Sequence, residues 1–94
     1  MDDLLNIPVG ETIREDYEGQ DYRFRRSSET DWEVFRIDSD GQLATIAEIE
    51  RLPNDEYPWM LYPRSPLHDQ EEYSNQGSLL RDAFKLPIPL DDLY

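Results

Sequence analysis

The tetrapeptide Asp38-Ser39-Asp40-Gly41 lies between two apolar runs and predicts a β-hairpin at the centre of the chain. Asp-Gly between such runs is the strongest short-range hairpin signal, because glycine readily adopts the positive φ that tight turns require. Residues 32–37 precede the turn and residues 42–51 follow it. The central fold is therefore expected to contain an antiparallel strand pair.

An earlier strand is predicted at residues 22–26. Tyr22 and Phe24 alternate there with Arg23 and Arg25, which is the period of a strand with one buried face. The arginines of this region have two interpretations, namely ion pairs with glutamates on neighbouring strands or a patch that contacts acidic groups of a partner. The arginines are Arg23, Arg25, Arg26 and Arg36, and the glutamates that could pair with them are Glu33, Glu48 and Glu50.

Two segments of the central hairpin leave alternatives open. In residues 32–37 the apolar side chains change face between Val34 and Phe35, which indicates either a bulge or a strand covered on both faces. Residues 42–51 fit a strand with Leu43, Thr45, Ala47 and Ile49 on one face, or a helix that ends before Pro53. Alanine and glutamate favour the helix, whereas the hairpin turn favours the strand, which we expect.

The remainder of the chain predicts an edge strand, a long connection and a helix. Residues 57–62 form the expected edge strand, since Pro58 has no N–H to donate to a ladder. Residues 63–77 are expected to be irregular, and Ser78 is expected to cap a helix over residues 79–86 that Pro87 terminates.

These elements predict a small α+β fold, an antiparallel meander of three to four strands with one short C-terminal helix. Within the 94 residues we expect an acidic N-terminal segment at residues 1–20, a single domain at residues 21–86 and an acidic-hydrophobic tail at residues 87–94. Both termini are expected to be partly extended. An aromatic content of 12% argues against a wholly disordered chain.

The charge of the chain excludes several classes of partner. With 22 acidic and 9 basic residues the net charge is −13, so direct nucleic-acid binding would be opposed by phosphate repulsion. No apolar run approaches the length of a membrane helix, and Met1-Asp2-Asp3 does not resemble the start of a signal peptide. We expect a protein of the host-cell cytoplasm whose partner is a protein with a basic surface. The oligomeric state stays open.

The residue types give no catalytic or metal site. The chain has no cysteine, and His68, its one histidine, lies in a predicted loop. A calcium loop that starts at Asp38 would need glycine at position six and glutamate at position twelve, where Leu43 and Ile49 stand. We therefore expect a non-enzymatic protein without metal or cofactor.

Acidic residues recur at i, i+2 spacing and provide the main functional clue. On an extended chain such side chains share a face about 6.6 Å apart, a spacing similar to that of successive nucleic-acid phosphates. Solubility, chance placement and adaptation to high salt would also produce such spacing. The predicted phosphate substitutes are Glu29, Asp31, Glu33, Asp38, Asp40, Glu48 and Glu50, and the predicted aromatic anchors are Trp59 and Tyr62.

These observations favour an acidic protein-binding module, in the sharpest form an inhibitor that mimics nucleic acid. It would block a basic nucleic-acid-handling protein, as an anti-defence protein of a virus or mobile element would. The alternative is an accessory subunit that docks through its terminal Asp-Asp-Leu segments, residues 2–4 and 91–93, with the acidity serving solubility or salt adaptation.

Overall fold

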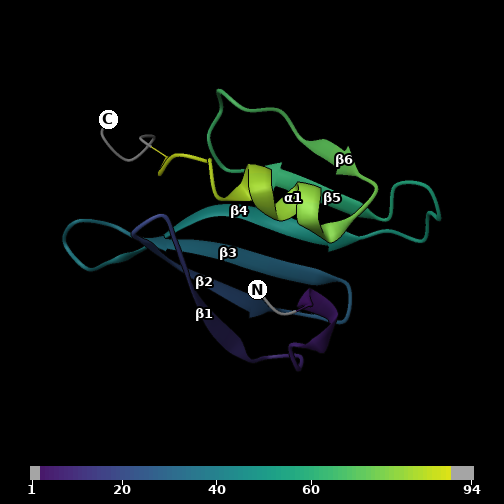
Figure 1. The fold of residues 1–94 in the computed structure, drawn as a ribbon, viewed down its shortest axis with the longest axis horizontal. Coiled ribbons are helices and arrows are strands. Elements are labelled where there is room, and N and C mark those ends of the chain that lie inside the picture. Colours follow the sequence, from purple (N-terminus) through teal and green to yellow (C-terminus); the bar gives the residue numbers. More distant parts are fainter. Residues whose placement is uncertain (1–2, 90–94) are drawn as a thin grey trace.

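The computed structural model describes residues 3–89 and contains one antiparallel sheet with a helix packed on one face (Figure 1). Each strand pairs with its neighbour in the sequence, so the order is β1-β2-β3-β4-β5-β6. The elements are η1 (Leu4–Asn6), β1 (Thr12–Tyr17), β2 (Gln20–Arg26), β3 (Asp31–Ile37), β4 (Leu43–Arg51), β5 (Trp59–Pro63), β6 (Glu71–Tyr73) and α1 (Gln76–Ala83). The α+β meander with a C-terminal helix is confirmed.

The prediction of three to four strands is wrong, because the described residues form six. β1 lies within the region predicted to be an acidic N-terminal segment, and it pairs along its whole length with β2. β6 lies within the predicted irregular connection and pairs with β5. β5 is therefore an internal strand rather than an edge, and Pro58 stands just before it.

Residues 43–51 form a strand, so the helical alternative is excluded. β4 pairs with β3, but the register shifts where Val34 pairs with Ala47 and Phe35 pairs with Thr45. Ile46 is the extra residue of this bulge, which explains why Ile46 and Ala47 are both buried. The change of face expected near Phe35 is thus confirmed, with the inserted residue on the partner strand.

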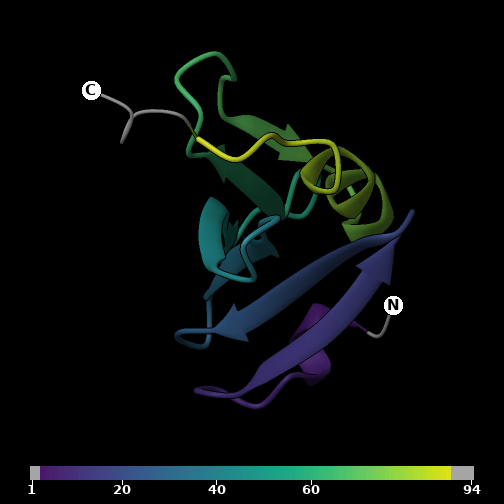
Figure 2. The same cartoon turned by 90° about the vertical axis from the view of Figure 1, so that its left-hand side faces the viewer.

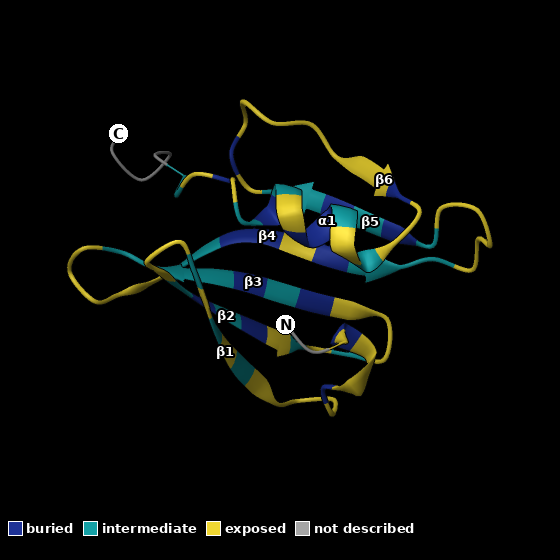
Figure 3. Ribbon diagram, in the orientation of Figure 1, coloured by how far each residue is buried: buried dark blue, intermediate teal, exposed yellow. Residues whose placement is uncertain are grey.

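The two faces of the sheet have different roles. The inner face carries the core, which α1 and the N-terminal turn cover. The sheet is strongly twisted, so its first strands run at a large angle to its last ones (Figure 2). Buried and exposed residues alternate along the strands as this arrangement requires (Figure 3). The largest fully buried side chains are Trp32, Tyr22, Phe24, Leu4, Ile46, Ile49, Leu61, Leu79 and Val34.

At one end of the inner face the N-terminal turn is fastened to the sheet and to α1. The indole Nε1 of Trp32 donates to the Leu4 carbonyl at 3.0 Å, and Gln76 accepts from the Leu4 N–H at 2.7 Å. Arg26 donates to the carbonyls of Leu5 and Ile7 at 3.0 and 2.9 Å. Residues 3–7 are therefore part of the folded body.

At the opposite end the core is aromatic. Phe84, which follows α1, stacks on Tyr17 of β1 with ring centroids 4.4 Å apart and meets Tyr22 and Phe24 edge-on. The hydroxyl of Tyr22 donates to the Phe84 carbonyl at 2.8 Å. These contacts hold the end of the helix against the first two strands.

The cap of α1 differs from the prediction. Asn75, not Ser78, is the N-cap, and its side-chain oxygen accepts from the Ser78 N–H at 2.8 Å. The helix therefore begins three residues earlier than expected. The described helices, three and eight residues long, are too short and polar to cross a bilayer.

The cap predicts a difference between two neighbouring polar residues. Asn75→Ala is expected to destabilise the protein by about 1 kcal/mol, because an N–H of the first turn loses its acceptor. Ser78→Ala is the matched control and should change the free energy of unfolding by less than about 0.5 kcal/mol. Urea denaturation followed by circular dichroism measures both, and equal effects would contradict the assignment of the cap.

Candidate functional site: an acidic face of the sheet

The outer face of the sheet brings acidic residues of β3 and β4 directly opposite one another. Glu33 pairs with Glu48, and two residues along the strands Asp31 pairs with Glu50. In each row the next residue on β5 is Tyr62 or Met60. We call Asp31, Glu33, Glu48, Glu50 and Tyr62 the acidic face.

Neighbouring side chains hold all four of these carboxylates in place, and Asp31 accepts from the Ser28 hydroxyl at 3.0 Å. Arg25 donates to Glu33 and Arg64 donates to Glu48, each at 3.0 Å, and the Tyr62 hydroxyl donates to Glu50 at 2.6 Å. The arginine side chains are about half exposed, so each pair contributes less than about 1 kcal/mol. Their effect is to orient the carboxylates while four acids face two arginines.

The acidic face surrounds a shallow hollow of about 360 Å³. Ser27, Trp32 and Ile49 also line it. The polar lining and open shape suit a charged group that approaches from outside rather than an enclosed apolar ligand.

The hydroxyl of Tyr62 is a firm proton donor in this site. Its hydrogen bond to Glu50 raises the pKa of Tyr62 to about 12, with smaller contributions from burial and from the charges of Glu50 and Asp31. A raised tyrosine pKa means that the phenol stays neutral at neutral pH. Tyr62 therefore positions Glu50 through this hydrogen bond.

The other predicted phosphate substitutes lie elsewhere. Glu29 lies in the turn between β2 and β3, where its carbonyl accepts from Arg26 at 2.6 Å. Asp38 lies in the opposite turn, and its carboxylate accepts from the N–H groups of Asp40 and Gln42. Asp38 therefore builds the turn, as the Asp-Gly signal indicated, and only four of the seven acids share the acidic face.

The two predicted aromatic anchors separate in the structure. Trp59 is only 3% exposed and packs against Trp32 in the core. Its burial contradicts the exposure that an aromatic anchor for a partner needs. Tyr62, three residues later on the same strand, points to the outer face. The i, i+3 spacing places them on opposite faces of β5.

Two outer-face residues, Met60 and Glu72, were not among the predicted site residues. The pairs Glu50–Met60 and Met60–Glu72 extend the row that starts at Asp31. Since β6 was not predicted, Glu72 had no predicted neighbour. The alternation of β5 alone would have placed Met60 beside Tyr62.

The carboxylates of the acidic face suit a positively charged group. No group of three or more acidic or histidine side chains in residues 3–89 is arranged to hold a metal ion. Leu4, in the N-terminal Asp-Asp-Leu segment, is fully buried, which weighs against docking through that segment. The C-terminal counterpart, residues 91–93, lies outside the described residues.

Comparisons with known proteins found no counterpart for this chain. No protein-family model matches it, no curated protein is significantly similar to it, and no solved structure significantly matches its fold.

Proposed function

We propose that this protein is a non-enzymatic module that binds a protein with a basic surface through its acidic face. The observation that carries the proposal is the cross-strand register, in which Glu33 faces Glu48 and Asp31 faces Glu50. Like charges directly opposite one another destabilise a sheet. Acids needed only for solubility could stand anywhere on the surface, without two repulsive pairs on the central strands.

The finer form of the proposal is inhibition by mimicry of nucleic acid. Along each strand the acids stand about 6.6 Å apart, and across the strands their Cβ atoms lie about 5 Å apart. A rigid array of this kind suits a groove that is lined with arginine and lysine. We place such an inhibitor in the cytoplasm of the host cell, as a viral or mobile-element anti-defence protein.

The test neutralises the acidic face. A variant with Asp31→Asn, Glu33→Gln, Glu48→Gln and Glu50→Gln is expected to lose at least tenfold in affinity for a partner captured by the natural protein from host lysate. The matched control neutralises four exposed acids elsewhere: Glu11, Glu18, Asp55 and Glu56. Both variants carry four fewer negative charges, so a loss in the first alone assigns binding to the acidic face.

Two further readouts separate recognition from folding. The acidic-face variant is expected to stay folded, with a free energy of unfolding within about 2 kcal/mol of the natural protein in urea. Relief of each like-charge pair, about 0.2–1 kcal/mol, offsets the loss of the two half-exposed ion pairs and of the Tyr62–Glu50 hydrogen bond. Partner binding should weaken strongly from about 50 to about 500 mM salt. Equal binding by the two variants would overturn the proposal, and failure of duplex DNA to compete would overturn mimicry alone.

A further inference from the structure

β1 forms one edge of the sheet, and no strand of residues 3–89 pairs with its open side. β1 and β2 are joined by the two-residue turn Glu18-Gly19, in which both residues have positive φ. A turn of this type closes on a hydrogen-bonded residue pair, here Tyr17 and Gln20. At the other end of the pairing the Arg26 N–H donates to the Glu11 carbonyl at 3.0 Å. Both ends therefore show that the odd-numbered residues of β1 direct their backbone groups toward β2.

The even-numbered residues of β1 direct their backbone N–H and C=O groups away from the sheet. These residues are Thr12, Arg14 and Asp16, and all three are exposed. Within residues 3–89 no hydrogen bond reaches these outward-facing groups. Proline, lysine or a very short strand usually protects an open edge, whereas β1 has six residues and neither residue type. The edge is therefore a ready template for an added strand.

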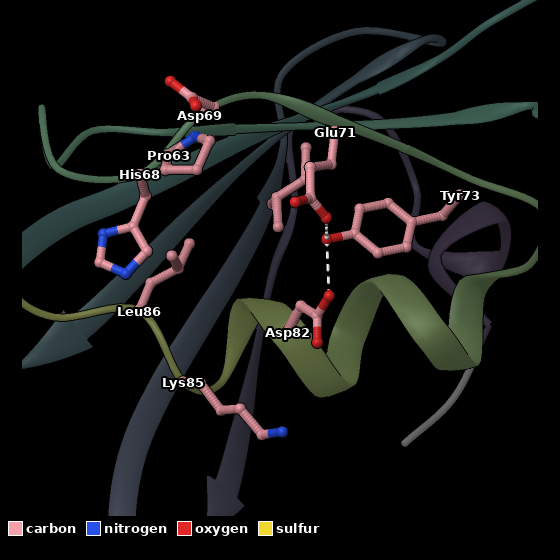
Figure 4. A pocket seen from close by; sticks show the side chains of 9 residues that line it. Pro63, His68, Asp69, Glu71, Tyr73, Asp82, Lys85 and Leu86 are labelled. Atoms are coloured by element: carbon pink, nitrogen blue, oxygen red, sulfur yellow. Dashed lines mark hydrogen bonds between the residues drawn. The ribbon is translucent and has the colours of Figure 1, made fainter.

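The opposite edge, β6, is too short and too acidic to serve in the same way. It has three residues, and its Glu71 and Glu72 would repel a second acidic strand. The Tyr73 hydroxyl lies 3.1 Å from Glu71 and 2.8 Å from Asp82, which fastens β6 to α1 (Figure 4). A cavity of about 270 Å³ lies between β5, β6 and the end of α1, and both carboxylates that line it already have this hydroxyl as a hydrogen-bond partner.

The side chains of β1 complement a second, antiparallel copy of the same strand. Backbone groups pair across such a junction only where outward-facing residues oppose one another, as Arg14 of one copy and Asp16 of the other do. This register gives two Arg14–Asp16 pairs, related by a two-fold axis, and four backbone hydrogen bonds between them. The Arg14 and Asp16 side chains are 63% and 67% exposed, so both can reach across the edge.

The other side chains of β1 favour the same register. On the inner face it sets Ile13 opposite Tyr17 of the second copy, an aliphatic–aromatic pair. Glu15 meets its counterpart at the axis, a modest cost that the two opposite-charge pairs outweigh. A slide of two residues in either direction would instead set Arg14 against Arg14 or Asp16 against Asp16, so the charges select one register.

We propose that two copies of this chain pair antiparallel through β1, with Arg14 of each copy opposite Asp16 of the other. The two-fold axis stands perpendicular to the sheet, so the outer face of one copy continues into the outer face of the other. Five strand spacings of about 4.8 Å then place β3 of one copy within about 24 Å of β3 of the other. The dimer stands independently of the proposed function, but it would present the acidic face twice on one side.

The experiment is analytical ultracentrifugation of the full-length protein without any partner, up to about 1 mM protein. We expect a monomer–dimer equilibrium with a dissociation constant on the order of 100 µM, as suits a small interface. Salt raised from about 50 to about 500 mM should strengthen the dimer, because it screens the repulsion between two chains of charge −13. Binding of a basic partner to the acidic face should weaken over the same range, so the two proposals fail separately.

Charge swaps on β1 test the register. Arg14→Asp and Asp16→Arg should each weaken the dimer about tenfold, because each turns two opposite-charge pairs into two like-charge pairs. The double variant restores opposite charges and the natural net charge, so its dissociation constant should return to within about threefold of the natural value.

Asp55→Arg is the matched control for Asp16→Arg, because it makes the same charge change at an exposed loop residue away from β1. It lowers the net negative charge and should therefore not weaken the dimer. All exchanged residues are exposed, so the variants should fold, which circular dichroism verifies. A natural protein that stays monomeric at about 1 mM overturns the proposal. Failure of the double variant to recover, or an Asp16→Arg variant that dimerises as well as Asp55→Arg, also overturns it.

Discussion

Trp32→Ala is expected to destabilise the protein by about 3–5 kcal/mol, the range for removal of a buried large aromatic side chain. Trp32 is fully buried, packs against Trp59 at 5.4 Å between ring centroids and donates to the Leu4 carbonyl. The stability of a small domain is only about 5–15 kcal/mol. This one change therefore removes a large share of the folding free energy.

Circular dichroism during urea unfolding measures the effect without relying on tryptophan fluorescence. Trp32→Phe and Trp59→Phe form a matched pair, because both shrink a buried indole but only Trp32 donates to a backbone carbonyl within the described residues. The first should cost more by about 1 kcal/mol, the value of a buried hydrogen bond. Equal losses for the two variants would show that the Leu4 contact contributes nothing.

Arg26→Lys is expected to destabilise the protein by about 2–3 kcal/mol and to release the N-terminal turn. The guanidinium donates to four carbonyls, those of Leu5, Ile7, Ser28 and Glu29, and lies over the Trp32 ring at 5.0 Å to its centroid. A lysine ammonium cannot reproduce this planar set of donors. The turn would then lose its two hydrogen bonds to the Arg26 side chain of β2.

The adjacent Arg25 supplies the control for Arg26. It points to the outer face, is half exposed and makes one ion pair with Glu33, so Arg25→Lys should cost less than about 1 kcal/mol. Limited proteolysis of residues 3–10, together with urea unfolding, reports the release of the turn. Unchanged proteolysis in Arg26→Lys would contradict the role assigned to the guanidinium.

The sequence predicted the elements whose signals are local. The Asp-Gly turn, the alternation around Tyr22 and Phe24 and the change of face near Phe35 all depend on immediate neighbours, and the structure confirms them. β1 was missed because Glu15 interrupts the apolar alternation of Ile13 and Tyr17. β6 has three residues, too few for a periodic signal, and exists through its pairing with β5.

The candidate site was predicted by residue type but not by arrangement. The i, i+2 spacing of acids correctly indicated that Glu48 and Glu50 share a face. The pairing of Glu33 with Glu48 and of Asp31 with Glu50 depends on the strand register. The hairpin and the bulge set this register together, and composition does not reveal it. The cavity of Glu71 and Asp82 was missed because it requires β6 and α1 to come together.

The consecutive pairing of the strands has a consequence for how the molecule fluctuates. Since each strand is bonded to those before and after it in the chain, β1 or β6 can peel away without opening the centre. A partner bound to the acidic face would contact β3, β4 and Tyr62 of β5. The amide protons of these central strands should exchange most slowly with solvent. In a monomer, the edge strands β1 and β6 would then keep their local opening motions in the complex, so binding would cost little conformational entropy.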